Sequence, residues 1–237
     1  MKSPLLGCAV LLSLSGCAFE QPPVRCIVGR GGHAVRYVLK EGSGACASKK
    51  PEIVGVQKYN PPGAQTQTVA LQPDALFRLV GEDADESHSP ISLGSLREDM
   101  PGQDGFCRVQ DVSEGRQQVT EEPGVDVRYA WSDVRFHVSA AAPGTQWLAT
   151  VRYTEGTCSA TYEAIGVFPA VSCHVRNDDG DLEYNEDGTP KTDARLCREP
   201  DYDTLLALDE SFPVRCDEAS ALCVLDSDSV PAFKRGN

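Results

Sequence analysis

Basic residues are scarce in this chain of 237 residues, and the shortage argues against two classes of function. The 22 Lys and Arg face 35 Asp and Glu, so the formal net charge is −13 at pH 7. Binding to nucleic acid needs clustered Lys and Arg that neutralise phosphates. Electrostatic docking on anionic lipid needs the same clusters. We therefore expect no nucleic-acid partner and no charge-driven contact with a membrane.

Catalytic and cofactor motifs are missing as well. The sequence has no G-x-S-x-G elbow, no H-E-x-x-H pair, no P-loop and no C-x-x-C pair. Its four His are scattered without ligand-like spacing. We predict that the protein is not an enzyme and needs no cofactor, although two carboxylates brought together only by folding escape a motif search.

Long apolar runs are absent too, since a helix needs about 20 such residues to span a bilayer. The apolar stretch Leu5–Leu14 follows the positive charge of Lys2 and has the length found in secretory signal peptides. It ends in Leu14-Ser15-Gly16-Cys17, which resembles the lipobox of bacterial lipoproteins. The alternative is an ordinary signal peptide with a chance cysteine at position 17.

The lipobox resemblance implies a processing route and a location. Residues 1–16 would be removed as a signal peptide, and Cys17 would carry acyl chains such as palmitate. Ala18 follows the lipid cysteine where retention in the inner membrane favours Asp. The resemblance thus implies a lipoprotein of the outer membrane that faces the periplasm or the cell surface.

Cysteine, in contrast, is frequent for a chain of this length, with ten copies. Setting aside Cys8 in the leader and the lipidated Cys17 leaves eight, an even number in an oxidising compartment, which predicts four disulfides. The connectivity is formally one of about a hundred possibilities. Proximity in the sequence favours Cys26–Cys46, Cys107–Cys158, Cys173–Cys197 and Cys216–Cys223.

Short alternating segments dominate the middle of the chain. Apolar and polar residues alternate through three runs, 125–140, 146–154 and 157–168, which predicts an antiparallel meander. The alternation changes phase at Ser132-Asp133, as expected at a bulge. Residues 82–105 are expected to form a surface loop, and residues 113–124 are polar with a turn at 121–124. The predicted fold is all-β: an antiparallel sandwich or barrel-like domain held by disulfides.

The composition changes after Cys173, because residues 177–203 hold ten acidic side chains and three basic ones. This predicts an acidic, loop-rich C-terminal appendage that packs on the β domain through its cysteines. Oxygen-bearing side chains alternate in the acidic loop 177–187, which makes a calcium site conceivable there. Its candidate ligands are Asp179, Asp181, Glu183, Asn185 and Asp187. The spacing fails the EF-hand pattern, so a solvated loop is the competing interpretation.

A glycan-binding face is the other conceivable site. Two Trp and three Tyr of the meander could stack on sugars: Trp131, Trp147, Tyr129, Tyr153 and Tyr162. Their position in the alternation favours the core instead.

Two phrases, Thr157 to Cys173 and Pro213 to Leu225, give the chain a loose resemblance to the cysteine-bridged, β-rich lipoproteins of Gram-negative gliding bacteria. The resemblance implies an envelope location and transfers no functional residue beyond Cys17. We predict a signal peptide (1–16), a lipidated tether (17–25), a β domain (26–172) and an acidic C-terminal segment (173–237). The predicted function is a non-enzymatic structural or protein-interaction role with an envelope protein partner; the alternative is a calcium- or glycan-binding module.

Overall fold

Eleven strands and three short helices make up the described part of the chain. The computed structural model describes residues 23–60, 63, 66–81, 87–120, 124–198 and 208–234, so the leader, Cys17 and most of the expected tether lie outside the described residues. The strands are β1 (Gly31–Gly42), β2 (Glu52–Tyr59), β3 (Gln67–Pro73), β4 (Ser92–Leu96), β5 (Phe106–Gln110), β6 (Gly115–Val119), β7 (Val125–Val138), β8 (Pro143–Glu155), β9 (Cys158–Val167), β10 (Val214–Asp217) and β11 (Leu222–Leu225). The helices are η1 (Ala45–Ser48), α1 (Asp74–Phe77) and η2 (Ala194–Cys197).

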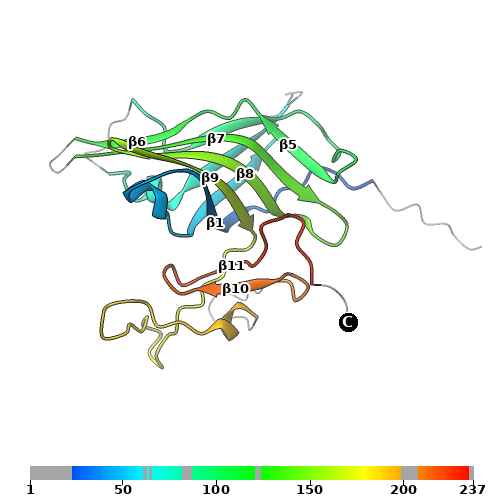
Figure 1. The fold of residues 1–237 in the computed structure, drawn as a ribbon. Coiled ribbons are helices and arrows are strands. Elements are labelled where there is room, and N and C mark those ends of the chain that lie inside the picture. Colours follow the sequence, from blue (N-terminus) through cyan, green and yellow to red (C-terminus); the bar gives the residue numbers. More distant parts are fainter. Residues whose placement is uncertain are drawn as a thin grey trace, which may run out of the picture.

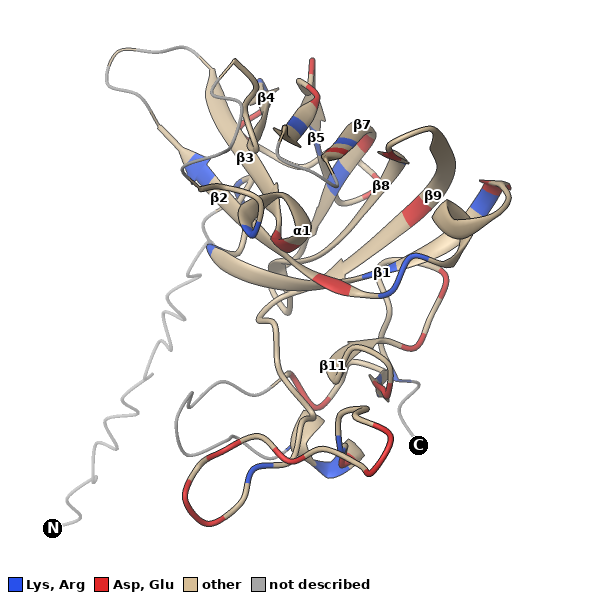
Figure 2. Ribbon diagram, turned by 90° about the vertical axis from the view of Figure 1, so that its left-hand side faces the viewer, with Lys and Arg blue, Asp and Glu red and all other residues tan. Residues whose placement is uncertain are grey.

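Strands β1 to β9 form one antiparallel sheet that closes on itself. Its order is β5-β4-β3-β2-β1-β9-β8-β7-β6, and an added pairing of β5 with β7 completes a ring of eight strands without β6. Figure 2 looks into this ring, with α1 inside it. The all-β prediction is confirmed, and the structure selects the barrel over the sandwich. The expected meander corresponds to β7, β8 and β9.

Two strands of the barrel lie where no strand was expected. Strand β4 falls within 82–105 and β6 within 113–124. The expected loop over 82–105 was wrong where β4 forms, and β6 was not predicted because it is polar: it reads Gly-Arg-Gln-Gln-Val and buries the amide side chain of Gln117. Pairing with β7 satisfies its backbone without an apolar alternation.

The predicted bulge is present in β7. Its pairing with β8 shifts register between Ser132 and Arg135, and Asp133 has a positive φ of 51°. The extra residue lets both Trp131 and Val134 face the interior, where they are 5% and 1% exposed.

Aromatic side chains fill the barrel. Trp147, Tyr129, Tyr162 and Phe136 are among the largest fully buried residues. Trp147 lies directly over Gly166 on the neighbouring β9, where an added Cβ would meet the indole nitrogen at 2.0 Å. The five rings considered as a glycan face therefore lie inside the barrel, between 0% and 8% exposed.

Covalent bonds close both mouths of the barrel. At one mouth, η1 follows β1, and its Cys46 is bonded to Cys158 at the start of β9. At the other, residues 23–30 run along the rim, and Cys26 is bonded to Cys107 of β5. The backbone N–H of Gly29 donates to Gly144 O at 3.0 Å, which holds the same segment to the start of β8.

The C-terminal segment, residues 170–234, packs against the outer face of β1 and β9 (Figure 1). Both side-chain N–H and O atoms of buried Gln146 bond to the backbone of Ala232, at 3.0 and 2.8 Å. Arg36 Nε donates to Leu225 O at 2.8 Å. The segment shares a second apolar core with the barrel wall, made by Ala34, Leu148, Ile165 and Val167 from the wall and by Val171, Phe212, Leu222 and Val224 from the segment, among others.

All eight expected cysteines are bridged, but every expected pairing was wrong. The bonds are Cys26–Cys107, Cys46–Cys158, Cys173–Cys216 and Cys197–Cys223, in place of Cys26–Cys46, Cys107–Cys158, Cys173–Cys197 and Cys216–Cys223. Two bonds lie within the barrel part and two within the C-terminal segment. None joins the two, so apolar packing and the hydrogen bonds of Gln146 and Arg36, not the cysteines, attach the segment to the barrel.

Among the residues that the structure describes, no helix has the length and apolar character needed to cross a membrane.

Candidate functional site

An interruption in the barrel wall forms the candidate site. Strand β5 pairs with β7 as far as Arg108 opposite Arg135, and β6 resumes the pairing at Gly115 opposite Tyr129. Strands β5 and β6 thus act as one broken strand along β7. Between the two paired stretches the β5–β6 connection and the middle of β7 separate, which leaves an opening across the ring from β1.

Both edges of this opening carry an aspartate with a left-handed backbone. Asp111 has φ 53° and Asp133 has φ 51°. A non-glycine residue in this region costs on the order of 1 kcal/mol or more, and such strain clusters at functional sites. Asp is among the residues that tolerate it best. The sequence therefore bends the chain outward on both edges with residues that also supply carboxylates.

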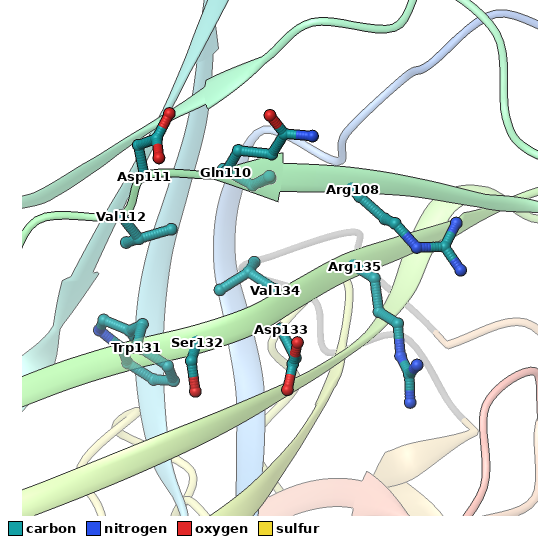
Figure 3. A pocket seen from close by; sticks show the side chains of 10 residues that line it. Arg108, Gln110, Asp111, Val112, Trp131, Ser132, Asp133, Val134 and Arg135 are labelled. Atoms are coloured by element: carbon teal, nitrogen blue, oxygen red, sulfur yellow. The ribbon is translucent and has the colours of Figure 1, made fainter.

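The opening leads into a cavity of about 370 Å³. Figure 3 shows Trp131 and Val112 at one end and the side chains of Arg108 and Arg135 at the other, with Val134 between them. The remaining lining comes from Val109, Gln110, Asp111, Ser132 and Asp133. The volume is that of a site for a small ligand, and the lining is mixed, with four apolar residues and six polar or charged ones.

Two hydrogen-bond donors in the cavity lining have no acceptor. Trp131 Nε1 and Arg135 Nε are buried and unbonded within the described residues. The Arg135 guanidinium lies 5.4 Å from the centre of the Phe106 ring, which holds it without satisfying its N–H groups. A buried donor without a partner costs about 1–3 kcal/mol. A ligand that supplied an acceptor would recover that cost.

Two of the neighbouring charges are already paired, whereas the Asp133 carboxylate of the lining has no ion pair within the described residues. Arg108 bonds Asp104 at 2.5 Å, and this contact lowers the pKa of Asp104 to about 2. Asp111 pairs with Arg97 at 3.0 Å. Arg135 is in no ion pair within the described chain either, so the lining holds one unpaired cation in the same cavity as the unpaired carboxylate of Asp133.

Lys49 and Glu52 form a second polar cluster, at the mouth closed by η1. Lys49 Nζ lies 2.9 Å from Glu52 Oε1, which also accepts from the hydroxyls of Tyr37 and Tyr129 at 2.7 and 2.8 Å. Lys49 Nζ also lies 4.3 Å from the centre of the Tyr153 ring. Burial, reinforced by Glu52, raises the pKa of Tyr37 and Tyr129, so both remain donors. The polar groups of the cluster bond one another, and they hold the chain next to η1 in place at this mouth of the barrel.

The predicted calcium ligands lie along two successive exposed turns, in loops on the side of the C-terminal segment away from the barrel (Figure 2). Several of these side chains already have partners. Glu183 pairs with Lys191, Asn185 Nδ2 donates to Thr189 Oγ1, and Asp187 Oδ1 accepts from the Thr189 backbone and hydroxyl. In the described chain, the groups of three or more close Asp, Glu, His or Cys ligand atoms do not include these acids.

The sulfurs of Cys173, Cys197 and Cys223 do lie close together, all within 4.8 Å of one another. Each of the three is already in a disulfide, two of them with each other. The grouping therefore reflects two adjacent disulfides.

The cavity in the wall was not predicted from the sequence. Its one visible signal was the phase change at Ser132-Asp133, which located one edge. The other edge lies in the polar stretch after Gln110, where nothing distinguishes a broken strand from a loop. Arg135 looked like an ordinary outward residue of β7.

Comparisons with known proteins agree with the extent of the barrel. The family model MlpA matches residues 31–169, which run from the start of β1 to just beyond the end of β9. The protein named "Putative lipoprotein MlpA" from Myxococcus xanthus, a gliding bacterium, is 33% identical over 181 residues, or 71% of this chain and 75% of that protein. No solved structure matches the chain.

Proposed function

The chain belongs to the MlpA family, and from this premise we propose that it is an outer-membrane lipoprotein that binds a small carboxylate in its wall cavity and catalyses no reaction. It is a lipoprotein of the type found in gliding bacteria, as the sequence resemblance implied. The observation that carries the binding role is the pair of buried, unsatisfied donors of Trp131 and Arg135.

The proposed anchor is the acylated Cys17 after removal of residues 1–16. Six residues, 18–23, lie between Cys17 and Val24, and Val24 is close to the start of the described chain. At about 3.3–3.6 Å per extended residue, a tether of this length reaches roughly 25 Å at most. The mouth crossed by residues 23–30 would therefore stay near the lipid surface, with the protein facing the periplasm or the cell surface.

A single substitution tests the anchor. Cys17→Ser should abolish incorporation of labelled palmitate and release the protein from the membrane fraction, since the acyl chains supply the hold. Cys8→Ser is the matched control and should change neither. Membrane retention and labelling of the Cys17→Ser protein would overturn the anchor without touching the binding proposal.

The proposed ligand class follows from the donors of the cavity. Indole and guanidinium N–H groups donate and cannot accept, so the ligand must bring acceptor oxygens. An unpaired guanidinium favours a carboxylate, because the charged hydrogen bond is stronger than a neutral one. Val109, Val112 and Val134 supply apolar contact for the rest of the molecule. The volume of about 370 Å³ limits the ligand to roughly the size of a monosaccharide acid.

Galacturonate and its uncharged counterpart galactose provide the test. Galacturonate at millimolar concentration should raise the melting temperature, since a ligand of the native state stabilises it, and galactose should not. Arg135→Gln should weaken binding about 10-fold or more, as expected for a lost charged hydrogen bond. Arg152→Gln, on the outer face of β8 and outside the cavity, should bind like the wild type.

Trp131→Phe examines the unsatisfied donor itself. The ring still fills the core, and no hydrogen bond is lost in the free protein, so its stability should change little. Affinity for galacturonate should fall about 3- to 10-fold. Equal responses to galacturonate and galactose, or binding that both Arg135→Gln and Trp131→Phe leave intact, would reject the proposal.

The envelope protein partner expected from the sequence remains a prediction. A partner that presents a side-chain carboxylate would meet the same chemistry at Arg135. Affinity capture from native envelope with wild-type and Arg135→Gln protein separates such a partner, which the substitution would release, from one that docks elsewhere.

A further inference from the structure

The order of the disulfides along the chain carries an inference about a folding partner. Cys26 bonds the third cysteine of the described chain and Cys46 the fourth, so these two bonds interleave. Cys173–Cys216 and Cys197–Cys223 interleave in the same way. No bond joins two cysteines that are neighbours in the sequence. We propose that the chain is a substrate of a thiol–disulfide isomerase of the cell envelope, which converts consecutive cysteine pairs into this interleaved set.

Chain statistics favour the wrong pairs during oxidation. The native Cys26–Cys107 bond spans 81 residues, whereas Cys26 and Cys46 are 20 apart. Because the probability of closing a flexible loop falls with roughly the 3/2 power of its length, the shorter loop is favoured about 8-fold. Cys223 is 26 residues from its native partner Cys197 and 7 from Cys216, which favours the wrong pair about 7-fold.

Local structure also favours the non-native pair Cys216–Cys223. Strands β10 and β11 are joined by a short turn, and their register places Cys216 directly opposite Cys223. A hairpin of this kind forms in about 1–10 μs, far ahead of the closure of the barrel ring. A bond between the two opposed cysteines would form before Cys173 and Cys197 are in place.

The rearrangement balances without an external oxidant. The reduced thiolate of the isomerase attacks one sulfur of the Cys216–Cys223 bond, forms a mixed disulfide and releases the other cysteine as a thiolate. That thiolate attacks the next wrong bond, and the chain of exchanges ends when a thiolate of the substrate expels the isomerase in its reduced form. The number of disulfides in the substrate is unchanged.

The native structure explains why the exchange stops. The sulfurs of Cys173, Cys197 and Cys223 lie within 4.8 Å of one another, so the final exchange needs little movement. Those three residues are at most 1% exposed once the segment packs on the barrel. Cys26, Cys46 and Cys107 are at most 2% exposed. Attack by an outside thiolate requires access, so Cys26–Cys107 and Cys197–Cys223 are protected at both sulfurs. The other two bonds have one half-buried cysteine each, Cys158 and Cys216, and one buried partner.

The test compares two bacterial host strains that produce the full chain, one with and one without its periplasmic disulfide isomerase. Disulfides are mapped by mass spectrometry of peptides from unreduced protein. The isomerase-containing strain should yield the four native bonds. In its absence, the native fraction should fall at least 5-fold, and Cys26–Cys46 and Cys216–Cys223 peptides should appear.

A matched variant removes the need for rearrangement. Serine at Cys46, Cys158, Cys197 and Cys223 leaves Cys26–Cys107 and Cys173–Cys216, which are now consecutive pairs. This variant should form both bonds equally in the two strains. The reciprocal variant, with serine at Cys26, Cys107, Cys173 and Cys216, makes the same prediction with the other two bonds.

If neither four-serine variant accumulates, the double variant Cys197→Ser/Cys223→Ser provides the test, because Cys173–Cys216 is then a consecutive pair. The fraction of Cys173–Cys216 bond should be the same in both strains, while the fractions of the two barrel bonds should still depend on the isomerase. Equal native fractions of the wild type in both strains would overturn the proposal. So would a variant that forms its consecutive pairs and still depends on the isomerase.

Discussion

The barrel and the C-terminal segment are held together in different ways, although each contains two interleaved disulfides. In the barrel, nine strands form one hydrogen-bonded sheet around a core of large aromatic residues. In its described residues, the segment has two strands of four residues each, one short 3-10 helix and scattered single bridges between residues. Its apolar residues gain a core only by packing on the outer wall of the barrel.

The difference shows what each part requires to fold. A ring of strands satisfies its own backbone and buries enough apolar surface to be stable. A short acidic segment with little regular structure cannot, so covalent bonds and a borrowed surface stabilise it. The match of the family model to residues 31–169 covers the part that supports itself. Substitutions in each part should therefore act on different scales.

The largest effect is expected in the barrel core. Trp147→Ala should lower the free energy of unfolding by about 3–5 kcal/mol, because the indole is fully buried among Trp131, Phe136 and His33. Chemical denaturation followed by circular dichroism measures it. Tyr184→Ala, whose ring is 58% exposed in the C-terminal segment, is the control and should cost far less. Similar decreases in the free energy of unfolding for Trp147→Ala and Tyr184→Ala would contradict the difference between the barrel and the segment.

The second effect should stay within the segment. Cys197→Ser/Cys223→Ser should cost about 2–4 kcal/mol by freeing a loop in the unfolded chain. Hydrogen exchange should quicken for residues 173–234, while amides of β7, β8 and β9 keep their protection, since none of the disulfides links the two parts. Loss of protection throughout the barrel would show that the segment is needed to hold the ring closed.

Acid should weaken the barrel through His33. Burial lowers the pKa of His33 to about 4, and its ring bonds Gly29 O at 2.9 Å and Trp147 Nε1 at 3.2 Å. Between pH 6.5 and about 4 the unfolded chain binds a proton that the folded chain does not. Stability should therefore fall as pH falls through this window, by up to about 3 kcal/mol.

Denaturation midpoints from pH 7 to 4 measure this dependence, and His33→Gln should flatten it. His137, whose pKa is also lowered by burial, adds a contribution of the same sign. The lowered pKa values of Asp104 and Asp126 beside arginines act mainly below about pH 5, because their usual pKa is about 3.9, and their contribution to stability is also lost as pH falls. An unchanged slope in the His33→Gln protein would contradict the assignment.

Calcium is expected to have the smallest effect. The acids of loop 177–187 are spread over two turns, and Glu183 and Asp187 already have partners. Millimolar calcium should give no binding heat in calorimetry and no rise in the melting temperature. A rise that Asp181→Asn removes would restore the calcium site predicted as an alternative.

The sequence predicted well what depends on neighbouring residues. Alternation identified β7, β8 and β9, and the phase change at Ser132-Asp133 located the bulge. The sequence did not predict the features that depend on closure of the ring of strands. Cys46 meets Cys158 because the end of β1 lies beside the start of β9, a relation between residues more than a hundred positions apart. The wall cavity depends on the same closure, since its edges come from β5 and β7.

The bond between Cys26 and Cys107 has a mechanical consequence for a tethered protein. Tension on a chain anchored at Cys17 would reach Cys26 before β1 begins. There the disulfide passes part of the load to β5, on the opposite side of the ring, so that β1 is not peeled away from β2 and β9 one hydrogen bond at a time. The barrel would be pulled as a whole body, and the wall cavity beside β5 would lie close to the point where the force enters.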